Sequence, residues 1–208
     1  MGRHAGWIAA ASALAATNET DPPHIILMPE VPFAKKKFID KVKQTVADEG
    51  FCVVVASEGT RYKNGMFLAD SGLTDAFGHK QLGGVAPVLA QMISSIGLKN
   101  HWAVSDYLQR SARHISSKTD LDQAYAVGKK AVEFALAGKN AVMPVIKRLS
   151  NKPYKWKIES ASLSKVANVE KTLPKGYISK DGFKVSNKGI DYLCLLYTSP
   201  SPRDGTKS

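Results

Sequence analysis

The sequence predicts an α/β fold in which helices flank a mostly parallel sheet. Two short, continuous apolar runs, residues 24–28 and 51–56, are typical of strands that are covered on both faces. Between them, residues 35–49 repeat apolar side chains at helical spacings of one, three and four, and Gly50 follows as a stop. A strand, a helix and a second strand of these lengths form the crossover unit of a parallel sheet.

The same patterns predict the remaining elements. The alanine-rich residues 5–16 predict a helix packed closely on a sheet, and the polar, glycine-dotted residues 62–79 predict a loop. Residues 82–96 predict a helix that ends at Gly97. Apolar periodicity predicts a further helix over 120–136 and strands over 101–107, 141–146 and 154–158.

The charge of the chain is unevenly distributed. The 208 residues carry a net charge of +11, and eleven Lys and Arg residues stand against three acids between Lys147 and Lys188. A basic excess of this kind favours a polyanionic partner or a small anionic substrate. A solvated lysine-rich face explains it equally well.

Cysteine usage and hydropathy indicate a compartment. The two cysteines, Cys52 and Cys194, form no disulfide framework and no metal cluster, which fits a reducing environment. No stretch approaches the roughly 20 apolar residues that a membrane span needs. We therefore expect a cytoplasmic protein with no membrane partner.

The first twenty residues, MGRHAGWIAAASALAATNET, allow two interpretations. One is a secretory signal peptide with a short basic start and an apolar run. The other is a phosphate-facing turn at Gly2-Arg3 that leads into a buried helix. Cysteine usage opposes export, so we favour the second interpretation.

Three positions at the carboxyl ends of predicted elements are candidates for ligand binding. Glu58 follows the strand predicted over 51–56 and can accept hydrogen bonds from sugar hydroxyls; alternatively it is a loop acid. Arg110 follows the strand predicted over 101–107 and can grip a phosphate bidentately; alternatively it is a surface arginine. Gly2-Arg3 can supply donors and a positive charge to a phosphate.

Other chemistry finds little support in the sequence. The five histidines share no ligand spacing, so we predict no metal site among these residues. Ser57-Glu58-Gly59 lacks the glycine that precedes the serine of a nucleophile elbow, and no Walker loop is present.

The last fifteen residues, CLLYTSPSPRDGTKS, follow no periodicity. A Ser/Pro linker or a disordered terminus explains them structurally. The string CLLYTSPSPRD also resembles the translated read-through of a transposase adaptor used in sequencing libraries. On that interpretation residues 194–208 are a non-native tail, and the biological sequence ends near Leu193.

Taken in order, several motifs resemble the phosphofructokinase family. They are MGRHAGWIA, LMPEVPF, SEGT, FGHKQLGGVAPVLAQMI, and DYLQRSARH followed by DLDQAYAVGKKAV, and they cover roughly residues 1–150. The form DYLQRS is similar to the pyrophosphate-dependent branch. The resemblance implies a phosphofructokinase-like α/β fold and the glycolytic phosphorylation of fructose 6-phosphate to fructose 1,6-bisphosphate, with pyrophosphate favoured over ATP as the donor.

The resemblance also implies residue roles. In the family, the MGR methionine and glycine line the sugar-phosphate site, which corresponds to Met1 and Gly2. The MGR arginine stabilises charge on the transferring phosphoryl group, so Arg3 is the expected catalytic residue. The EG glutamate holds sugar hydroxyls, which corresponds to Glu58. The QR arginine binds the 6-phosphate, which corresponds to Arg110, with Tyr107 at the neighbouring contact position.

This chain also departs from the family pattern. Its glycine-rich donor loop and the segment with its aspartate base precede the MGR motif, so we expect an incomplete fold and a fragment that is inactive alone. The resemblance implies Mg²⁺, bound in that preceding part, and a homo-oligomer in the full-length protein, without nucleic acid.

We divide the chain into a substrate-side α/β part at 1–150, Lys-rich segments of the same chain at 151–193 and the tail at 194–208. A non-catalytic basic module that binds anions or nucleic acid is the alternative function.

Overall fold

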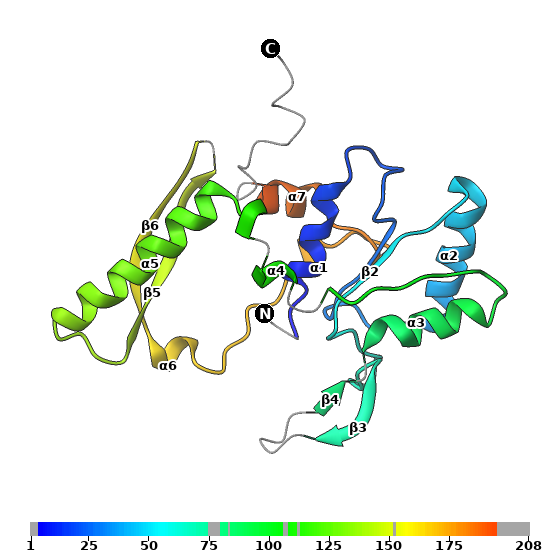
Figure 1. Ribbon diagram of the computed structural model, residues 1–208, viewed down its shortest axis with the longest axis horizontal. Coiled ribbons are helices and arrows are strands. Elements are labelled where there is room, and N and C mark those ends of the chain that lie inside the picture. The colour runs from blue at the N-terminus through cyan, green and yellow to red at the C-terminus, as the bar shows by residue number, and fades with distance from the viewer. Residues whose placement is uncertain are drawn as a thin grey trace, which may run out of the picture. The chain divides into compact units, whose positions relative to one another are not determined.

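The chain forms two compact units. The computed structural model describes residues 4–74, 80–82, 84–105, 108–111, 113–151 and 153–194. The first unit comprises Met1–Asp106 together with Lys171–Ile190, and the second comprises Tyr107–Glu170 together with Asp191–Ser208 (Figure 1). Each unit is described by itself below. The division predicted at residues 150 and 193 stays a prediction.

The centre of the first unit is a parallel strand pair, as the sequence predicted, but both strands are shorter than expected. The prediction that the second is covered on both faces is wrong, because the residues of β2 are only half-buried and Phe51 and Val53 before it are exposed. β1 (Ile25–Leu27) pairs in parallel with β2 (Val54–Ala56), with Ile25 opposite Val54. All three residues of β1 are buried, which accounts for the continuous apolar run. The buried side chain of His24 fixes the entry to the pair, because its Nδ1 accepts a hydrogen bond of 2.9 Å from the Val53 N–H.

The helix that connects these strands has the predicted bounds. α2 (Lys35–Glu49) buries Phe38, Ile39, Val42 and Thr45 on one face, at the spacing seen in the sequence. Gly50 ends the helix in the left-handed region, with a φ of 81°, where glycine avoids a steric penalty. Because α2 follows β1 and precedes β2, the segment forms the predicted crossover.

The other helices of the first unit are shorter than expected. The helix predicted over 5–16 consists of α1 (Trp7–Ala11) and a 3₁₀ turn, η1 (Ser12–Ala15). The helix predicted over 82–96 is α3 (Val85–Ser94), which contributes Val85 and Leu89 to the core. Both elements are of the predicted type.

Two local predictions are wrong. The segment 62–79, expected to be loop, contains β3 (Asp70–Thr74), which pairs antiparallel with β4 (Lys80–Leu82); residues 75–79 lie outside the described part. Residues 101–105, where a strand was predicted, have no regular secondary structure, and all five are exposed. A strand needs a hydrogen-bonded neighbour, and alternation in the sequence does not supply one.

A late segment of the chain completes the first unit. It contains η3 (Lys175–Tyr177), an isolated bridge between Ile178 and Val185, and the start of α7 (Asn187–Cys194). Phe183 enters the hydrophobic core, and its carbonyl oxygen accepts a hydrogen bond of 2.7 Å from the Ile26 N–H of β1. We call residues 171–190 the return segment.

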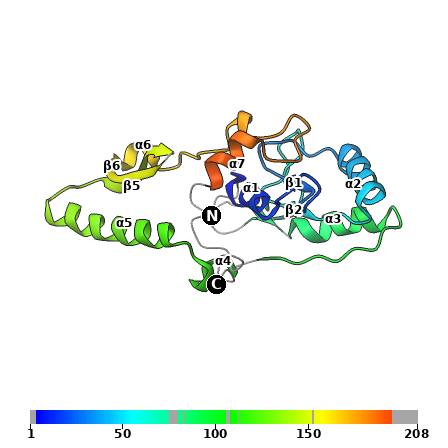
Figure 2. The same cartoon turned by 90° about the horizontal axis from the view of Figure 1, so that it is seen from above.

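The second unit consists of a hairpin and a long helix. β5 (Val142–Asn151) and β6 (Tyr154–Ser162) pair antiparallel, and α5 (Lys118–Leu136) runs along the hairpin (Figures 1 and 2). Both predicted strands are longer than expected, and the hairpin spans residue 150. Short elements complete the unit: α4 (Leu108–Ser111), η2 (Arg113–Ile115) and α6 (Leu163–Val166).

The junction between α5 and the hairpin is polar at one point and aromatic at another. Gln123 is buried and donates a hydrogen bond of 2.8 Å from Nε2 to the hydroxyl of Tyr154. Phe134 is buried near the other end of the helix. Ser117 caps the first turn, since its Oγ accepts a hydrogen bond of 3.0 Å from the Asp120 N–H.

Within the described part of the chain, no helix combines the length and the apolar character that crossing a membrane would require.

Candidate active site

Glu58 lies in a tight turn at the carboxyl end of β2, at the position that the sequence predicted. The Ser57 N–H donates to the carbonyl oxygen of Leu27 in β1 over 2.9 Å, and the Ser57 carbonyl oxygen accepts from the N–H and the hydroxyl of Thr60. Thr60 is only 1% exposed, whereas Glu58 is exposed. The turn is therefore held by buried hydrogen bonds, while its carboxylate faces solvent at the edge where α/β proteins bind ligands.

The segment after Glu58 contacts the segment after the MGR motif. Residues 60–68 form a small hairpin, in which the Leu68 N–H donates to the Thr60 carbonyl oxygen over 2.8 Å. Phe67 of this hairpin stacks on His4, with ring centroids 5.6 Å apart and an interplanar angle of 18°. His4 directly follows Arg3 in the sequence, so the residue next to the MGR motif contacts the hairpin that follows Glu58. Met1, Gly2 and Arg3 themselves lie outside the described residues.

The third predicted site segment belongs to the second unit. Arg110 lies in the short helix α4, and its side chain is outside the described part. Tyr107 also lies outside the described residues. The roles predicted for Arg3, Glu58, Tyr107 and Arg110 thus stay predictions.

Sequence reasoning missed Glu30, an acid that links three segments of the first unit. Its Oε1 accepts hydrogen bonds from the Gly6 N–H over 3.0 Å and from the Leu173 N–H over 2.8 Å. Glu30 stands within the LMPEVPF motif, two residues after the buried Met28 and directly after a proline. A carboxylate at the end of a fully buried strand was the signal available in the sequence.

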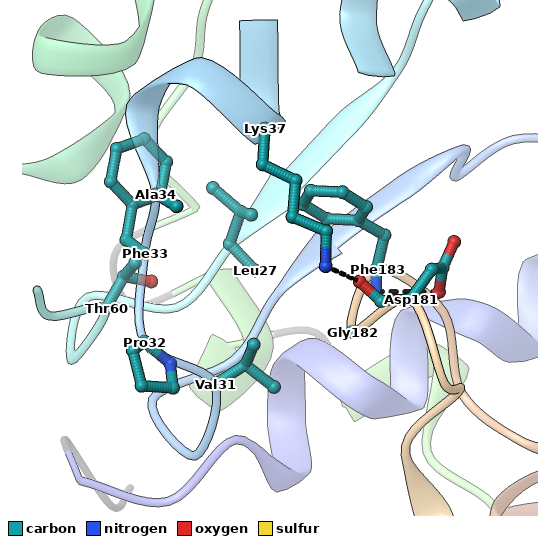
Figure 3. Close-up of a pocket in the computed structure, with 10 residues that line it drawn as sticks. All are labelled: Leu27, Val31, Pro32, Phe33, Ala34, Lys37, Thr60, Asp181, Gly182 and Phe183. Atoms are coloured by element: carbon teal, nitrogen blue, oxygen red, sulfur yellow. Dashed lines mark hydrogen bonds between the residues drawn. The ribbon is translucent and has the colours of Figure 1, made fainter. Parts of the chain in front are cut away.

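A small cavity lies beside the return segment and is drawn in Figure 3. It has a volume of about 30 Å³, enough for water but not for a sugar phosphate. Lys37 is one of the lining residues; it donates a hydrogen bond of 2.7 Å to the carbonyl oxygen of Asp181, and its Nζ lies 5.2 Å from the centroid of the Phe183 ring. We therefore do not assign substrate to this cavity.

The carboxylate of Asp181 stabilises the turn beside this cavity. Partial burial raises its pKa, but hydrogen bonds from the Ser179 hydroxyl and the Phe183 N–H, together with the charges of Lys41 and Lys37, outweigh burial. The net result is a pKa below the ordinary 3.8. Asp181 is therefore ionised at neutral pH and holds the return segment in its turn.

The described residues offer no fit for the Mg²⁺ that the family implies. They contain no group of three His, Cys, Asp or Glu side chains that could hold a metal ion together. Mg²⁺ prefers several oxygen ligands in octahedral geometry. We therefore assign Mg²⁺ to none of these residues.

The parallel pair β1–β2 and its crossover helix α2 are those of an α/β protein. Sequence comparison places the chain in one family. Residues 1–135 match the family described as Phosphofructokinase. The chain therefore belongs to the phosphofructokinase family, as the motifs predicted.

Named relatives narrow the comparison. The chain is 59% identical over 201 residues to pyrophosphate–fructose 6-phosphate 1-phosphotransferase of Halomonas elongata, and 54% identical over 204 residues to the protein of that name from Xanthomonas campestris. These matches cover 96% and 97% of this chain and 47% and 49% of the relatives. The chain thus spans about half the length of the curated relatives it matches.

A solved structure confirms the predicted fold class. The crystal structure of a pyrophosphate-dependent phosphofructokinase from Marinobacter aquaeolei aligns with a TM-score of 0.80 at 53% sequence identity. The alignment covers 97% of this chain and 47% of that protein.

Proposed function

We propose that this chain is the substrate-side part of a pyrophosphate-dependent 6-phosphofructokinase. The observation that carries the proposal is 59% identity, across nearly the whole chain, to a relative named for pyrophosphate and fructose 6-phosphate. In the proposed reaction the 1-hydroxyl oxygen of fructose 6-phosphate bonds to a phosphorus atom of pyrophosphate. The bond from that phosphorus to the departing phosphate breaks, and the hydroxyl proton leaves.

Each candidate residue has a role in that reaction that suits its chemistry. Glu58 accepts hydrogen bonds from sugar hydroxyls, and its exposure on a rigid turn supports this role. Arg110, with Tyr107 beside it, binds the 6-phosphate, because a guanidinium matches the geometry of phosphate oxygens. Arg3 neutralises charge on the transferring phosphoryl group, next to the surface that Met1 and Gly2 line. Phosphoryl transfer depends largely on such positioning and charge neutralisation.

The wider setting is part of the same proposal. Fructose 1,6-bisphosphate formation belongs to glycolysis, and we propose a cytoplasmic homo-oligomer that uses Mg²⁺. The relatives' names, which give both substrates, support the substrate assignment.

The test of the substrate site is binding of fructose 6-phosphate to the 208-residue chain, measured by isothermal titration calorimetry. We expect saturable binding that weakens about tenfold or more in E58A and in R110A, because E58A removes the acceptor for the sugar hydroxyls and R110A removes the donor to the phosphate. Glu49→Ala, at an exposed acid at the end of α2, is the matched control and should bind as the wild type does. Absence of saturable binding, or equal binding by all variants, would contradict the proposal.

The donor is tested separately. The protein as its locus encodes it is assayed for fructose 1,6-bisphosphate formation with pyrophosphate or with ATP. We expect turnover with pyrophosphate, and turnover with ATP alone would exclude the proposed donor.

The described residues favour no second function. In the basic hairpin, Lys157 and Lys147 both pair with Glu159, at 2.6 and 3.2 Å. The Arg148 guanidinium lies 4.0 Å from the centroid of the Tyr192 ring and donates hydrogen bonds to the carbonyl oxygen of that residue. These cations have partners within their own unit, so the lysine excess alone gives no reason to propose a nucleic-acid partner.

A further inference from the structure

We propose that Glu30 is a positioning residue of the sugar-phosphate site, which holds in place the segment that leads from Gly2-Arg3 into α1. This inference rests on the proposed function, because it assigns a supporting residue to the same site. Glu30 is not expected to touch substrate. Its carboxylate acts through Gly6, three residues after Arg3.

The geometry at Glu30 ties distant parts of the sequence to one atom. Its Oε1 accepts from the Gly6 N–H, 24 positions away, and from the Leu173 N–H, 143 positions away, at 3.0 and 2.8 Å. Hydrogen bonds to a charged acceptor are shorter and stronger than neutral ones. One carboxylate oxygen thus joins the end of β1, the entry to α1 and the return segment.

The lack of a side chain at Gly6 permits this contact. A Cβ atom at Gly6 would lie 2.8 Å from Oε2 of Glu30 and 3.1 Å from the Cβ of Met28. Contacts that short force a neighbour to move, so the backbone reaches the carboxylate only because position 6 has no side chain. The close approach leaves the entry to α1 little freedom to shift.

Contacts on either side of Gly6 hold the same short segment. His4 stacks on Phe67 of the hairpin that follows Glu58. Trp7 donates a hydrogen bond of 2.6 Å from Nε1 to the carbonyl oxygen of Lys171. Residues 4, 6 and 7 are therefore each anchored, and Arg3 directly precedes this anchored stretch in the sequence. A phosphate-binding turn needs such support, because small displacements of a site cost much of its effect.

The second oxygen of Glu30 shows that the contact is costly. Oε2 is buried and has no hydrogen-bond partner among the described residues. Burying an unpartnered oxygen of a carboxylate opposes folding. Glutamine at position 30 would keep the acceptor, since its amide oxygen also accepts two hydrogen bonds, whereas alanine would remove it. This comparison defines the variants that test the inference.

The test compares E30A, E30Q and V42A in the 208-residue chain. Fructose 6-phosphate affinity is measured by calorimetry well below each melting temperature, and exchange of the Gly6 and Leu173 amides is measured by NMR. E30A should bind about tenfold more weakly and lose protection of both amides. E30Q should keep its affinity and the exchange rates of the two amides within about threefold of the wild-type values, because glutamine retains the hydrogen-bond acceptor. V42A removes buried core side-chain atoms, so it should lose stability but keep its affinity.

The outcomes separate the inference from the proposed function. If the wild type binds and E30A binds equally well, Glu30 does not position the site and the proposed function stands. If E30Q is as weak as E30A, or if V42A loses as much affinity, the hydrogen-bonding explanation is wrong. If the wild type itself shows no saturable binding, the proposed function falls, and the inference falls with it.

Discussion

Phe183→Ala tests whether the return segment is an integral part of the first unit. Phe183 is 7% exposed and belongs to the core cluster that contains β1 and α2. Truncating a buried phenylalanine costs about 3–5 kcal/mol, and losing the contact with Lys37 adds about 0.5–1 kcal/mol. We therefore expect F183A to lower the free energy of unfolding by about 3–6 kcal/mol, a large share of the stability of a typical domain.

The assay is urea denaturation of the whole chain, combined with amide exchange at Ile26. The Ile26 N–H donates to the Phe183 carbonyl oxygen, so release of the return segment would expose this amide specifically. F183L keeps an apolar side chain and should cost less than about 1.5 kcal/mol. I8A, at a residue 51% exposed, should cost about 1 kcal/mol or less. A loss below about 1 kcal/mol in F183A, with Ile26 still protected, would show that residues 171–190 contribute little to the unit.

Three further changes test individual contacts. G6A should lower both stability and fructose 6-phosphate affinity, because its Cβ would collide with Glu30; calorimetry and thermal unfolding measure the two effects, and an unchanged affinity would contradict the expectation. D181N should destabilise the chain at neutral pH. The folded-state pKa of Asp181 lies below 3.8, so the stability it contributes is present above that pH and is lost as the pH falls through the folded value. Urea denaturation at neutral pH and in acid should show that the free energies of unfolding of the wild type and D181N converge in acid. A difference between them that does not change with pH would refute the assignment. S117A should cost about 1 kcal/mol by removing the hydrogen bond that the Ser117 hydroxyl accepts from the Asp120 N–H, with S116A, at the exposed serine directly before it, as the control; equal unfolding curves for both would argue against a capping role.

Local periodicity accounts for the elements that the sequence predicted well. α2 has the predicted bounds because its apolar side chains recur at helical spacing, and Gly50 adopts the left-handed conformation that ends it. β1 is a continuous apolar run because both of its faces are covered. In α2 and β1 the spacing of apolar residues along the sequence directly reflects which faces are buried. The sequence alone was therefore sufficient to predict these two elements.

Pairing between strands was harder to predict. The glycine-dotted segment that contains β3 gave turn signals, and its antiparallel partner β4 is only three residues long. Residues 101–105 alternate as a strand does but are exposed. The period of side chains along one strand describes its two faces, whereas its hydrogen bonds depend on a second segment.

The residues of the candidate site also differ in how far local sequence could place them. The position of Glu58 was predictable because it stands two residues after β2, at the carboxyl end of the parallel pair, and that placement needs only local sequence. Glu30 also follows a buried strand, yet its partners are Gly6 and Leu173, and no pattern in the sequence joins these positions. The residue type shows which side chains can bind a phosphate or a hydroxyl. The contacts that position those side chains come from residues distant in the sequence.

The lysine-rich last third of the chain is divided between the two units. Its most basic part is a hairpin in the second unit, where lysines and an arginine already have acidic or aromatic partners. The return segment that follows enters the first unit, with Leu173 on the Glu30 carboxylate and Phe183 in the core. Residues that looked like a charged appendage therefore include the side of the first unit against which the entry to α1 is fixed. A change that displaces the Leu173 backbone from Glu30 should act on sugar-phosphate binding through Gly6, although the return segment contains none of the residues expected to touch the sugar.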